Sequence, residues 1–241
     1  MMDDDTQHHI SQQFNVELRE LRNQVLSMGG LVEEQLANAL QALTQRNDKL
    51  AEQVYTGDYK INALEVAIDE DCTRILALRQ PTASDLRLVL AVEKTITDLE
   101  RIGDEAESIA KMSVDKDLQD AQPRHYLAIR HLGEHVRQML HDTLDSFARM
   151  DVDSALMVIK EEAEVDDEYE NISRQLITYM MEDPRAIPIV LNILWSARAL
   201  ERIADHACNI CQYVIFFVRG KHVRHHHILD KMELHTLQGR T

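Results

Sequence analysis

The feature that most constrains the fold of this chain is an internal repeat. The segment 99–104, Leu-Glu-Arg-Ile-Gly-Asp, returns as Leu-Glu-Arg-Ile-Ala-Asp at 200–205. Upstream of each copy, the apolar series in 28–43 corresponds to the series in 132–147. A repeat that extends over so much of the sequence indicates a duplicated structural unit. We therefore expect two similar halves, each with its own copy of the candidate site.

The distribution of turn-forming residues points to long helices. Only seven glycines and four prolines occur in 241 residues, which is too few for an all-β chain. Apolar residues instead recur at spacings of three and four, the period of a helix with one buried face. This periodicity predicts six helices, at about 10–46, 49–78, 84–112, 125–150, 153–181 and 185–218.

Six long helices with short connections predict an all-α fold of two tandem, similar three-helix bundles. We expect the first bundle over residues 1–115 and the second over 123–222. The polar stretch 113–124, where the two bundles meet, contains Pro123 and is typical of a domain boundary. Residues 223–241 are rich in histidine, and we expect them to form a flexible tail.

Charge and cysteine content limit the classes of function. The formal net charge of −16 repels phosphates and anionic lipid heads, which argues against direct binding of nucleic acid or membranes. Three cysteines do not make a disulfide framework and indicate a reducing compartment. The acidic start of the chain is unlike a signal peptide, and the longest apolar run, 214–218, is too short to span a bilayer. We therefore expect a cytoplasmic protein that reaches a membrane only through protein partners.

Carboxylates occupy positions where the helical pattern calls for apolar residues. Asp58 and Glu65 fall on the apolar stripe of the second predicted helix, and Glu162 falls at the equivalent place in the second repeat. A buried carboxylate costs free energy unless something pairs with it. The pattern contains four pairs of acidic or amide residues spaced i,i+4, which puts both members on one helix face: Asp58/Asn62, Glu100/Asp104, Glu162/Asp166 and Glu201/Asp205.

Two interpretations of these pairs stay open. If the second and third helices of each repeat are neighbours, the pairs converge on one patch. Carboxylate oxygens from facing helices bind hard or borderline cations well, so the patch would be a metal site. Alternatively, Arg101 and Arg202, which stand next to the acidic residues, neutralise them by ion pairs without a metal.

No motif for catalysis accompanies the acidic pairs. Di-iron carboxylate bundles use Glu-x-x-His, and no Glu stands three residues before any of the twelve histidines. There is also no Gly-x-Ser-x-Gly motif, Walker loop or His-Glu-x-x-His zincin motif. Cys208 and Cys211 stand inside a predicted helix, and we interpret them as small core residues. We expect no enzymatic activity.

The connection between the second and third predicted helices, 79–87, is dense in polar residues. Because loops carry recognition more often than helix flanks do, we interpret this segment as a surface for docking a partner. Simple helix capping by Ser84 or Asp85 is the alternative. The docking candidates are Arg79, Pro81, Ser84, Asp85 and Arg87, together with Arg101 and Arg202.

The segment 99–104, its second copy and the segment 79–87 together resemble the PhoU family, the accessory regulators of phosphate-specific transport. The resemblance implies a cytoplasmic protein, peripheral to the inner membrane, that contacts the ATPase subunit of the phosphate transporter and the sensor histidine kinase of the phosphate regulon. It implies negative regulation of that regulon, restraint of phosphate uptake, and a homodimer. The alternative function is a carboxylate-based protein that binds or buffers metal.

The same resemblance assigns metal ligands, because some family members bind iron, zinc, manganese or magnesium through the duplicated acidic motif. By position the motif falls on Glu100, Asp104, Glu201 and Asp205, with Asp58, Asn62, Glu162 and Asp166 as facing partners. Three departures imply that the two sites differ in metal preference. Glu105 stands where the second repeat has His206, Ala204 replaces a usual Gly, and Asn62 is a weaker ligand than a carboxylate.

Overall fold

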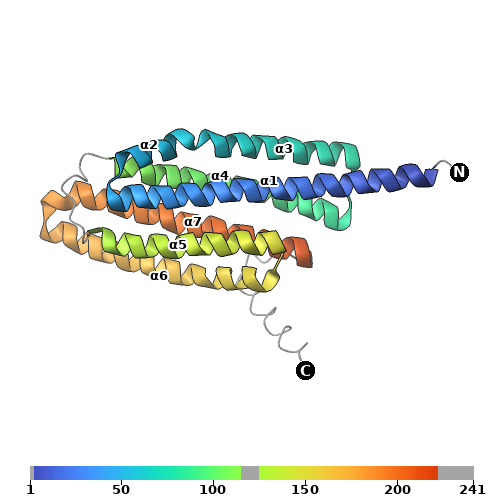
Figure 1. Ribbon diagram of the computed structural model, residues 1–241. Coiled ribbons are helices and arrows are strands. Elements are labelled where there is room, and N and C mark those ends of the chain that lie inside the picture. The colour runs from blue at the N-terminus through green and yellow to red at the C-terminus, as the bar shows by residue number, and fades with distance from the viewer. Residues whose placement is uncertain (1–2, 115–124, 222–241) are drawn as a thin grey trace, which may run out of the picture.

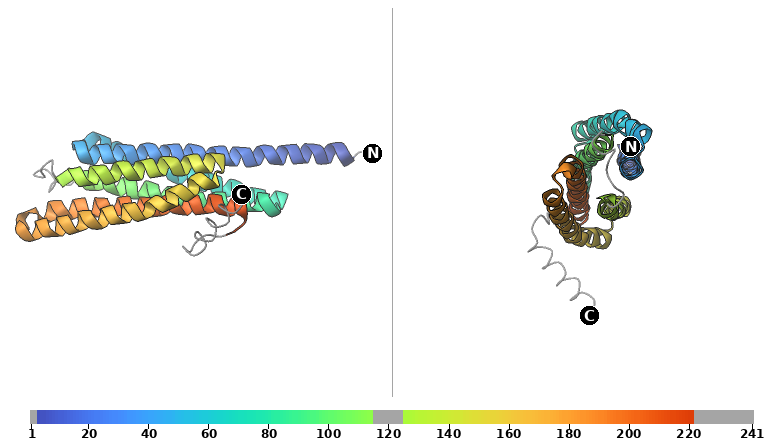
Figure 2. Two further views of the ribbon diagram at one scale, coloured as in Figure 1. Left: turned by 90° about the horizontal axis from the view of Figure 1, so that it is seen from below. Right: turned by 90° about the vertical axis from the view of Figure 1, so that its left-hand side faces the viewer.

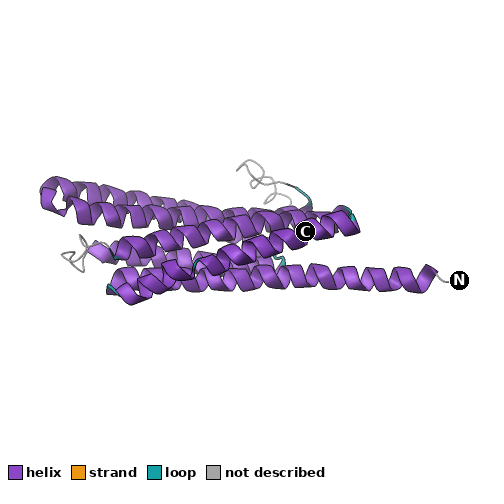
Figure 3. Ribbon diagram, turned by 90° about the horizontal axis from the view of Figure 1, so that it is seen from above, coloured by secondary structure: helices purple, strands orange, loops and turns teal. Residues whose placement is uncertain are grey.

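The computed structural model describes residues 3–114 and 125–221, and over these residues the chain is helical without strands (Figures 1 and 3). Residues 115–124 of the predicted boundary stretch 113–124 and the predicted tail at 223–241 lie outside the described residues. The elements are α1 (Asp3–Gln45), α2 (Asp48–Gly57), α3 (Tyr59–Arg79), α4 (Ala83–Ser113), α5 (His125–Arg149), α6 (Val152–Glu182), the 3-10 helix η2 (Pro184–Ala186) and α7 (Ile187–Arg219). The predicted all-α plan of long helices is confirmed.

The second predicted helix differs from its expected form because it is interrupted at Asp58, which separates α2 from α3. Asp58 keeps helical dihedral angles, and its carbonyl accepts from the amide of Ile61 at 2.9 Å and from that of Asn62 at 3.3 Å. The shorter of these is an i→i+3 bond, the tighter pattern that often marks a break in an α-helix. The break directly follows Gly57, and it places Asp58 at a joint.

The helices form two bundles that share one core. In the first bundle, α1, α2–α3 and α4 pack together, and in the second, α5, α6 and α7 do so (Figures 1 and 2). The bundles meet through α4 against α7 and through α1 against α5. The buried apolar side chains of all these elements belong to a single continuous cluster. Consequently α3 and α6 lie on the outside, and the third helix of each repeat is the most enclosed.

The two halves are related by an approximate two-fold arrangement, in which α1 runs antiparallel to α5 (Figure 1). Gly29 of α1 lies against Leu144 of α5, and a Cβ at position 29 would be only 2.5 Å from the Leu144 Cδ2. Gly133 of α5 lies against Leu40 of α1, with the same 2.5 Å separation for a Cβ at 133. The repeat alignment pairs Gly29 with Gly133 and Leu40 with Leu144. The contact is therefore reciprocal, as at an isologous dimer interface.

We predict that alanine has opposite effects at two adjacent glycines of α1. No atom lies within 4 Å of a Cβ built on Gly30, so Gly30→Ala should raise the free energy of unfolding by about 0.5–1 kcal/mol, the helix preference of Ala over Gly. Gly29→Ala must displace Leu144, and overpacking of this kind costs about 1–3 kcal/mol, so the variant should show no gain or a net loss. Urea denaturation measures both values. Equal stabilisation by the two substitutions would contradict the close approach of α1 and α5.

Candidate functional site

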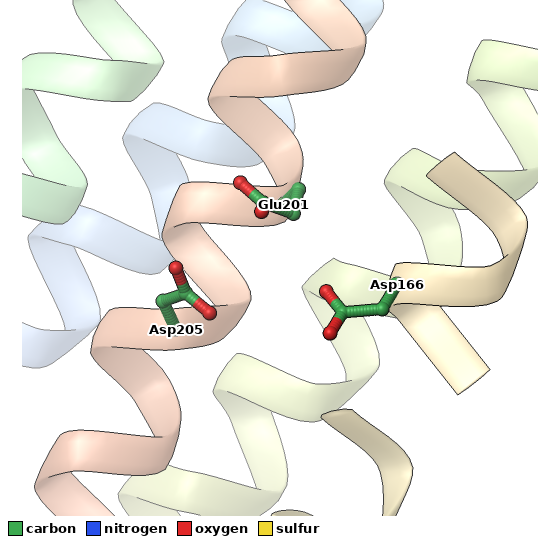
Figure 4. A group of neighbouring side chains, drawn as sticks. All are labelled: Asp166, Glu201 and Asp205. Carbon is green, nitrogen blue, oxygen red and sulfur yellow. The ribbon is translucent and has the colours of Figure 1, made fainter. Parts of the chain in front are cut away.

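Three predicted acidic residues of the second repeat converge between α6 and α7. Asp166 of α6 faces Glu201 and Asp205 of α7 (Figure 4), and one carboxylate oxygen from each lies within 4.8 Å of the others. Glu201 and Asp205 are one helical turn apart and so project to the same side. Because α7 packs against α4, α5 and α6, Glu201 is only 8% exposed. The arrangement concentrates negative charge at a partly enclosed position.

Glu201 is incompletely neutralised. Its Oε1 accepts from Nη1 of Arg198 at 2.7 Å, whereas its buried Oε2 has no hydrogen-bond partner among the described residues. Burial raises the pKa of Glu201, and the charges of Asp205 and Asp166 raise it further, against the opposing effect of Arg198. Burial and the charge of Asp166 likewise raise the pKa of Asp205. A bound cation would remove both the repulsion and the unsatisfied oxygen.

Glu162 does not join this group, although the sequence predicted it as a facing partner. Its side chain interacts with the thiol of Cys208, whose pKa is raised mainly by burial and further by Glu162. In the first repeat the equivalent Asp58 approaches Gly103 so closely that a Cβ there would be 3.4 Å from its Oδ1. The second repeat has Ala204 at the equivalent position, where its methyl group occupies that space.

The first repeat satisfies its buried carboxylate with amides. Asp58 is 7% exposed, and its Oδ1 accepts from Nε2 of Gln35 at 2.8 Å while its Oδ2 accepts from Nδ2 of Asn62 at 3.0 Å. The same Gln35 nitrogen donates to the carbonyl of Gly103 at 3.1 Å. Both oxygens of Asp58 therefore have donors, and Asn62 acts as a partner of Asp58. This interaction links α1, α3 and α4.

Glu100 and Asp104 lie close to Glu65, an acidic residue that the predicted ligand set left out. Burial raises the pKa of Glu100, and the charges of Asp104 and Glu65 raise it further. Burial and then Asp58 raise the pKa of Asp104. The pKa of Glu65 is raised by burial, Asp69 and Asp104. The sequence signal for Glu65 was its place on the apolar stripe, seven residues after Asp58.

The two arginines next to the acidic pairs have different roles. Arg101 is 57% exposed, with its Nε 3.7 Å from Oε2 of Glu100. Arg202 crosses to the other bundle, where its Nη1 lies 2.8 Å from Oε1 of Glu105. Nearby, Nδ1 of His206 lies 2.7 Å from Oδ1 of Asp98. Glu105 and His206, the residues that differ between the repeats, therefore both form contacts between α4 and α7.

The predicted docking segment lies at one end of the molecule (Figure 2), and both of its arginines make contacts within the protein. Arg79 binds the carboxylate of Glu17 through Nε at 2.9 Å and Nη2 at 2.6 Å, which lowers the pKa of Glu17. Arg87 donates from Nε to the carbonyl of Phe217 at 3.3 Å. Pro81 and Asp85 are half-buried, and Ser84 is exposed.

Helix capping by Ser84 or Asp85 is not observed in this segment. Thr82 is the N-cap residue of α4, and it makes no side-chain capping bond. The interpretation of Cys208 and Cys211 as core residues is confirmed, since both are buried. No helix in the part of the chain that the structure describes is long and apolar enough to cross a membrane.

Comparisons with known proteins agree with this architecture. A family model described as PhoU domain matches twice, at residues 25–113 and 129–214. The phosphate-specific transport system accessory protein PhoU of Serratia marcescens is 54% identical over 217 residues, covering 90% of this chain and 89% of that protein. The protein of that name from Escherichia coli (strain K12) is 52% identical over 217 residues, covering 90% of each chain.

Two solved structures have the same fold. The crystal structure of PhoU from Pseudomonas aeruginosa superposes with a TM-score of 0.84 at 51% identity, covering 86% of this chain and 100% of that one. The structure of the phosphate transport system regulatory protein PhoU from Streptococcus pneumoniae gives 0.80 at 33% identity, covering 88% of this chain and 100% of that one.

We predict that Glu201→Gln stabilises the metal-free protein in a pH-dependent manner. The folded-state pKa of Glu201 is raised, so the stability linked to its protonated form is present below the unfolded value of about 4.3 and is lost as pH rises through the folded pKa. The variant has no titrating group at this position and therefore no such loss. Its free energy of unfolding should exceed that of the wild type by about 1 kcal/mol at neutral pH, the lower end of the cost of an unsatisfied buried polar group.

Thermal unfolding in a chelator, from mildly acidic to mildly alkaline pH, measures this difference. The advantage of Glu201→Gln should grow with pH, whereas Glu52→Gln, at an exposed position of α2, should stay close to the wild type throughout. A difference between Glu201→Gln and the wild type that does not change with pH would contradict the prediction.

Proposed function

The chain belongs to the PhoU family, and on that premise we propose that it is an adaptor that reports phosphate status from the phosphate transporter to a sensor histidine kinase. The observation that carries this conclusion is the match of the family model to both repeats. Close relatives are named accessory proteins of the phosphate-specific transport system, so the chain acts in the regulation of phosphate transport and is associated with that system. The family is one of regulatory accessory proteins.

The adaptor would contact the ATPase subunit of the transporter and the membrane-bound kinase, restrain uptake, and keep the regulon inactive when phosphate is plentiful. It would act through protein contact without catalysis, in the cytoplasm and at the inner membrane through its partners. The strong negative charge supports a protein partner with a basic surface over nucleic acid or anionic lipid. These contacts extend to this chain the role in phosphate transport for which its relatives are named.

The geometry separates two groups among the docking candidates. Arg79, Arg87 and Arg202 hold helices of the chain together, so their replacement would disturb the fold. Ser84 and Arg101 are exposed and are the candidates best placed to contact a partner directly. A homodimer is also part of the proposal, and it is supported by exposed large apolar side chains such as Met181 and Trp195.

We also propose that Asp166, Glu201 and Asp205 hold a cation such as iron, zinc, manganese or magnesium. The residues fit such a group because three carboxylates converge and the buried Oε2 of Glu201 lacks a donor among the described residues. Carboxylate oxygens are the donors that hard cations prefer. When bound, the cation would neutralise the three charges and connect α6 to α7. In the first repeat, Glu100 and Asp104 are weaker candidates because the amides of Gln35 and Asn62 satisfy Asp58.

The convergence of the three carboxylates also favours a second candidate function, a protein that binds or buffers metal. A deletion strain distinguishes the two functions. Constitutive phosphatase expression in high phosphate supports the adaptor, whereas altered metal tolerance alone supports the buffer.

For the adaptor, we predict that the protein co-isolates with the transporter ATPase from detergent-solubilised membranes of phosphate-replete cells. Arg101→Glu should reduce the recovered ATPase severalfold. Because this substitution also places a carboxylate beside Glu100, urea denaturation must show that the variant is folded under the conditions of the isolation. Arg174→Glu, on the exposed outer side of α6, is the matched control and should leave recovery unchanged. Complete absence of the ATPase from the wild-type sample would refute the proposed contact.

For the cation site, we predict unequal effects at equivalent positions of the two repeats. The full chain with its tail histidines, taken as those at 222, 225–227 and 235, replaced by Asn avoids chelation by the C-terminal segment. In this background Asp205→Asn should abolish binding of Mn²⁺, and Asp104→Asn should retain it. At a hundredfold excess of Mn²⁺ over its dissociation constant, binding adds about 2.7 kcal/mol to the stability, which calorimetry detects. If Asp104→Asn abolished Mn²⁺ binding and Asp205→Asn retained it, the ion would lie in the first repeat instead.

A further inference from the structure

Side chains of the kind that bind zinc gather between α5 and α6, and the proposed function does not use them. His131 and His135 lie one turn apart on α5, which packs beside α6 (Figure 1). Both face Glu168 of α6. The Nδ1 of His131 is 3.3 Å from Oε2 of Glu168, and the Nδ1 of His135 is 3.0 Å from Oε1. Two imidazoles and one carboxylate thus meet between these two helices.

The spacing of these residues matches a known ligand pattern. Residues 131–135 read His-Leu-Gly-Glu-His, which is the order His-x-x-Glu-His of a class of zinc proteins and the inverse of the zincin order. Two histidines spaced i,i+4 on one helix face bind one zinc ion, and a Glu from elsewhere completes the His₂Glu set of several zinc sites. Because the Glu precedes the second histidine and does not follow the first, the segment is not a His-Glu-x-x-His zincin motif.

The internal repeat supplies a comparison within the same chain. The positions equivalent to His131, His135 and Glu168 are Ser27, Leu31 and Leu64. Leu31 and Leu64 are partly buried and pack against the hydrophobic core. The first bundle therefore fills this place with apolar contacts, and the second has a histidine and a glutamate there. Polar groups at a packing position cost free energy that a bound ion would offset.

The surroundings of the two histidines also favour a cation. The pKa of Glu161 on α6 is raised by burial and by the charges of Asp142 and Glu164, and it is lowered by His135. These carboxylates are therefore close enough to act on one another and on His135. A locally negative potential beside the two imidazoles increases the affinity for a divalent ion.

We propose that His131, His135 and Glu168 form a binding site for a zinc-class divalent cation, separate from the carboxylate group between α6 and α7. Imidazole ligands suit Zn²⁺, Ni²⁺ and Cu²⁺, whereas an all-carboxylate group suits Mg²⁺ and Mn²⁺. The imidazoles face different oxygens of Glu168, so coordination requires a side-chain rotation, which His131 can make because its side chain is 80% exposed. Binding would connect α5 to α6.

The geometry points to binding without hydrolysis. In zinc peptidases the Glu of such a motif acts as the general base. Here the carboxylate of Glu134 is held by the guanidinium of Arg137, with Nε 3.3 Å from Oε2 and Nη2 close to Oε1. In this arrangement Glu134 is paired with a cation one turn further along α5. The site is therefore a ligand set without its catalytic base.

The experiment is a competition titration with Zn²⁺ against a chromophoric chelator. It uses the full chain with the tail histidines replaced by Asn, in excess Mg²⁺ to occupy the carboxylate group. We expect one Zn²⁺ per chain. His131→Asn and Glu168→Gln should each weaken Zn²⁺ binding by about tenfold or more. Removal of a group that only hydrogen-bonds to a zinc ligand already costs about tenfold, and removal of a ligand itself should cost at least as much. His141→Asn, elsewhere on α5 and paired with Glu33, is the control and should bind as the parent does.

A second measurement identifies the ligands directly. Co²⁺ in place of Zn²⁺ should give a visible absorption spectrum that disappears in His135→Asn and persists in Asp205→Asn. Because His131 is exposed, His131→Asn should fold normally even if a variant of the less exposed His135 does not. Zn²⁺ binding that is unchanged in His131→Asn and Glu168→Gln, or that is lost only in Asp205→Asn, would overturn the proposal.

Discussion

The close approach of α1 and α5 at two glycines is the constraint on which the rest of the structure depends. Gly29 accommodates Leu144, and Gly133 accommodates Leu40 in return, so a side chain at either glycine would have to displace the leucine opposite it. This contact and the packing of α4 on α7 merge two small bundles into one core. Glu201 is buried on α7, a helix that contacts α4 of the other bundle as well as α5 and α6, and burial is the main cause of the raised pKa values of Glu201 and Asp205.

The two copies of the acidic motif show how a duplicated scaffold supports different chemistry. In the first repeat, Gln35 and Asn62 complete the hydrogen bonding of Asp58. In the second, the methyl group of Ala204 stands where Gly103 admits Asp58, Glu162 interacts with Cys208, and Glu201 keeps an unsatisfied oxygen. Small differences in volume and in donor groups therefore distinguish the proposed cation site from its counterpart in the first repeat.

Much of the fold could be predicted from the sequence, because helical periodicity and an internal repeat are both patterns of residue type that are visible without knowing any tertiary contact. The convergence of Asp166, Glu201 and Asp205 followed from i,i+4 spacing on helices expected to be neighbours. Contacts between halves could not be predicted in this way. The pairs Arg202–Glu105 and His206–Asp98 depend on the relative placement of α4 and α7, and the buried carboxylate of Asp58 accepts from Gln35 of α1, a donor distant in the sequence.

The approximate two-fold packing also has a genetic consequence. In a true homodimer every substitution occurs twice, and a residue near the axis meets its own copy, so a new charge there repels itself. Joining both halves in one chain removes that restriction, since each face is encoded separately. Contacts across the axis then need not be reciprocal: Arg202 pairs with Glu105, whereas His206, at the position equivalent to Glu105, contacts Asp98. One half can also acquire His135 where the other keeps Leu31, so the chain can gain new chemistry on one side while the other side preserves the frame.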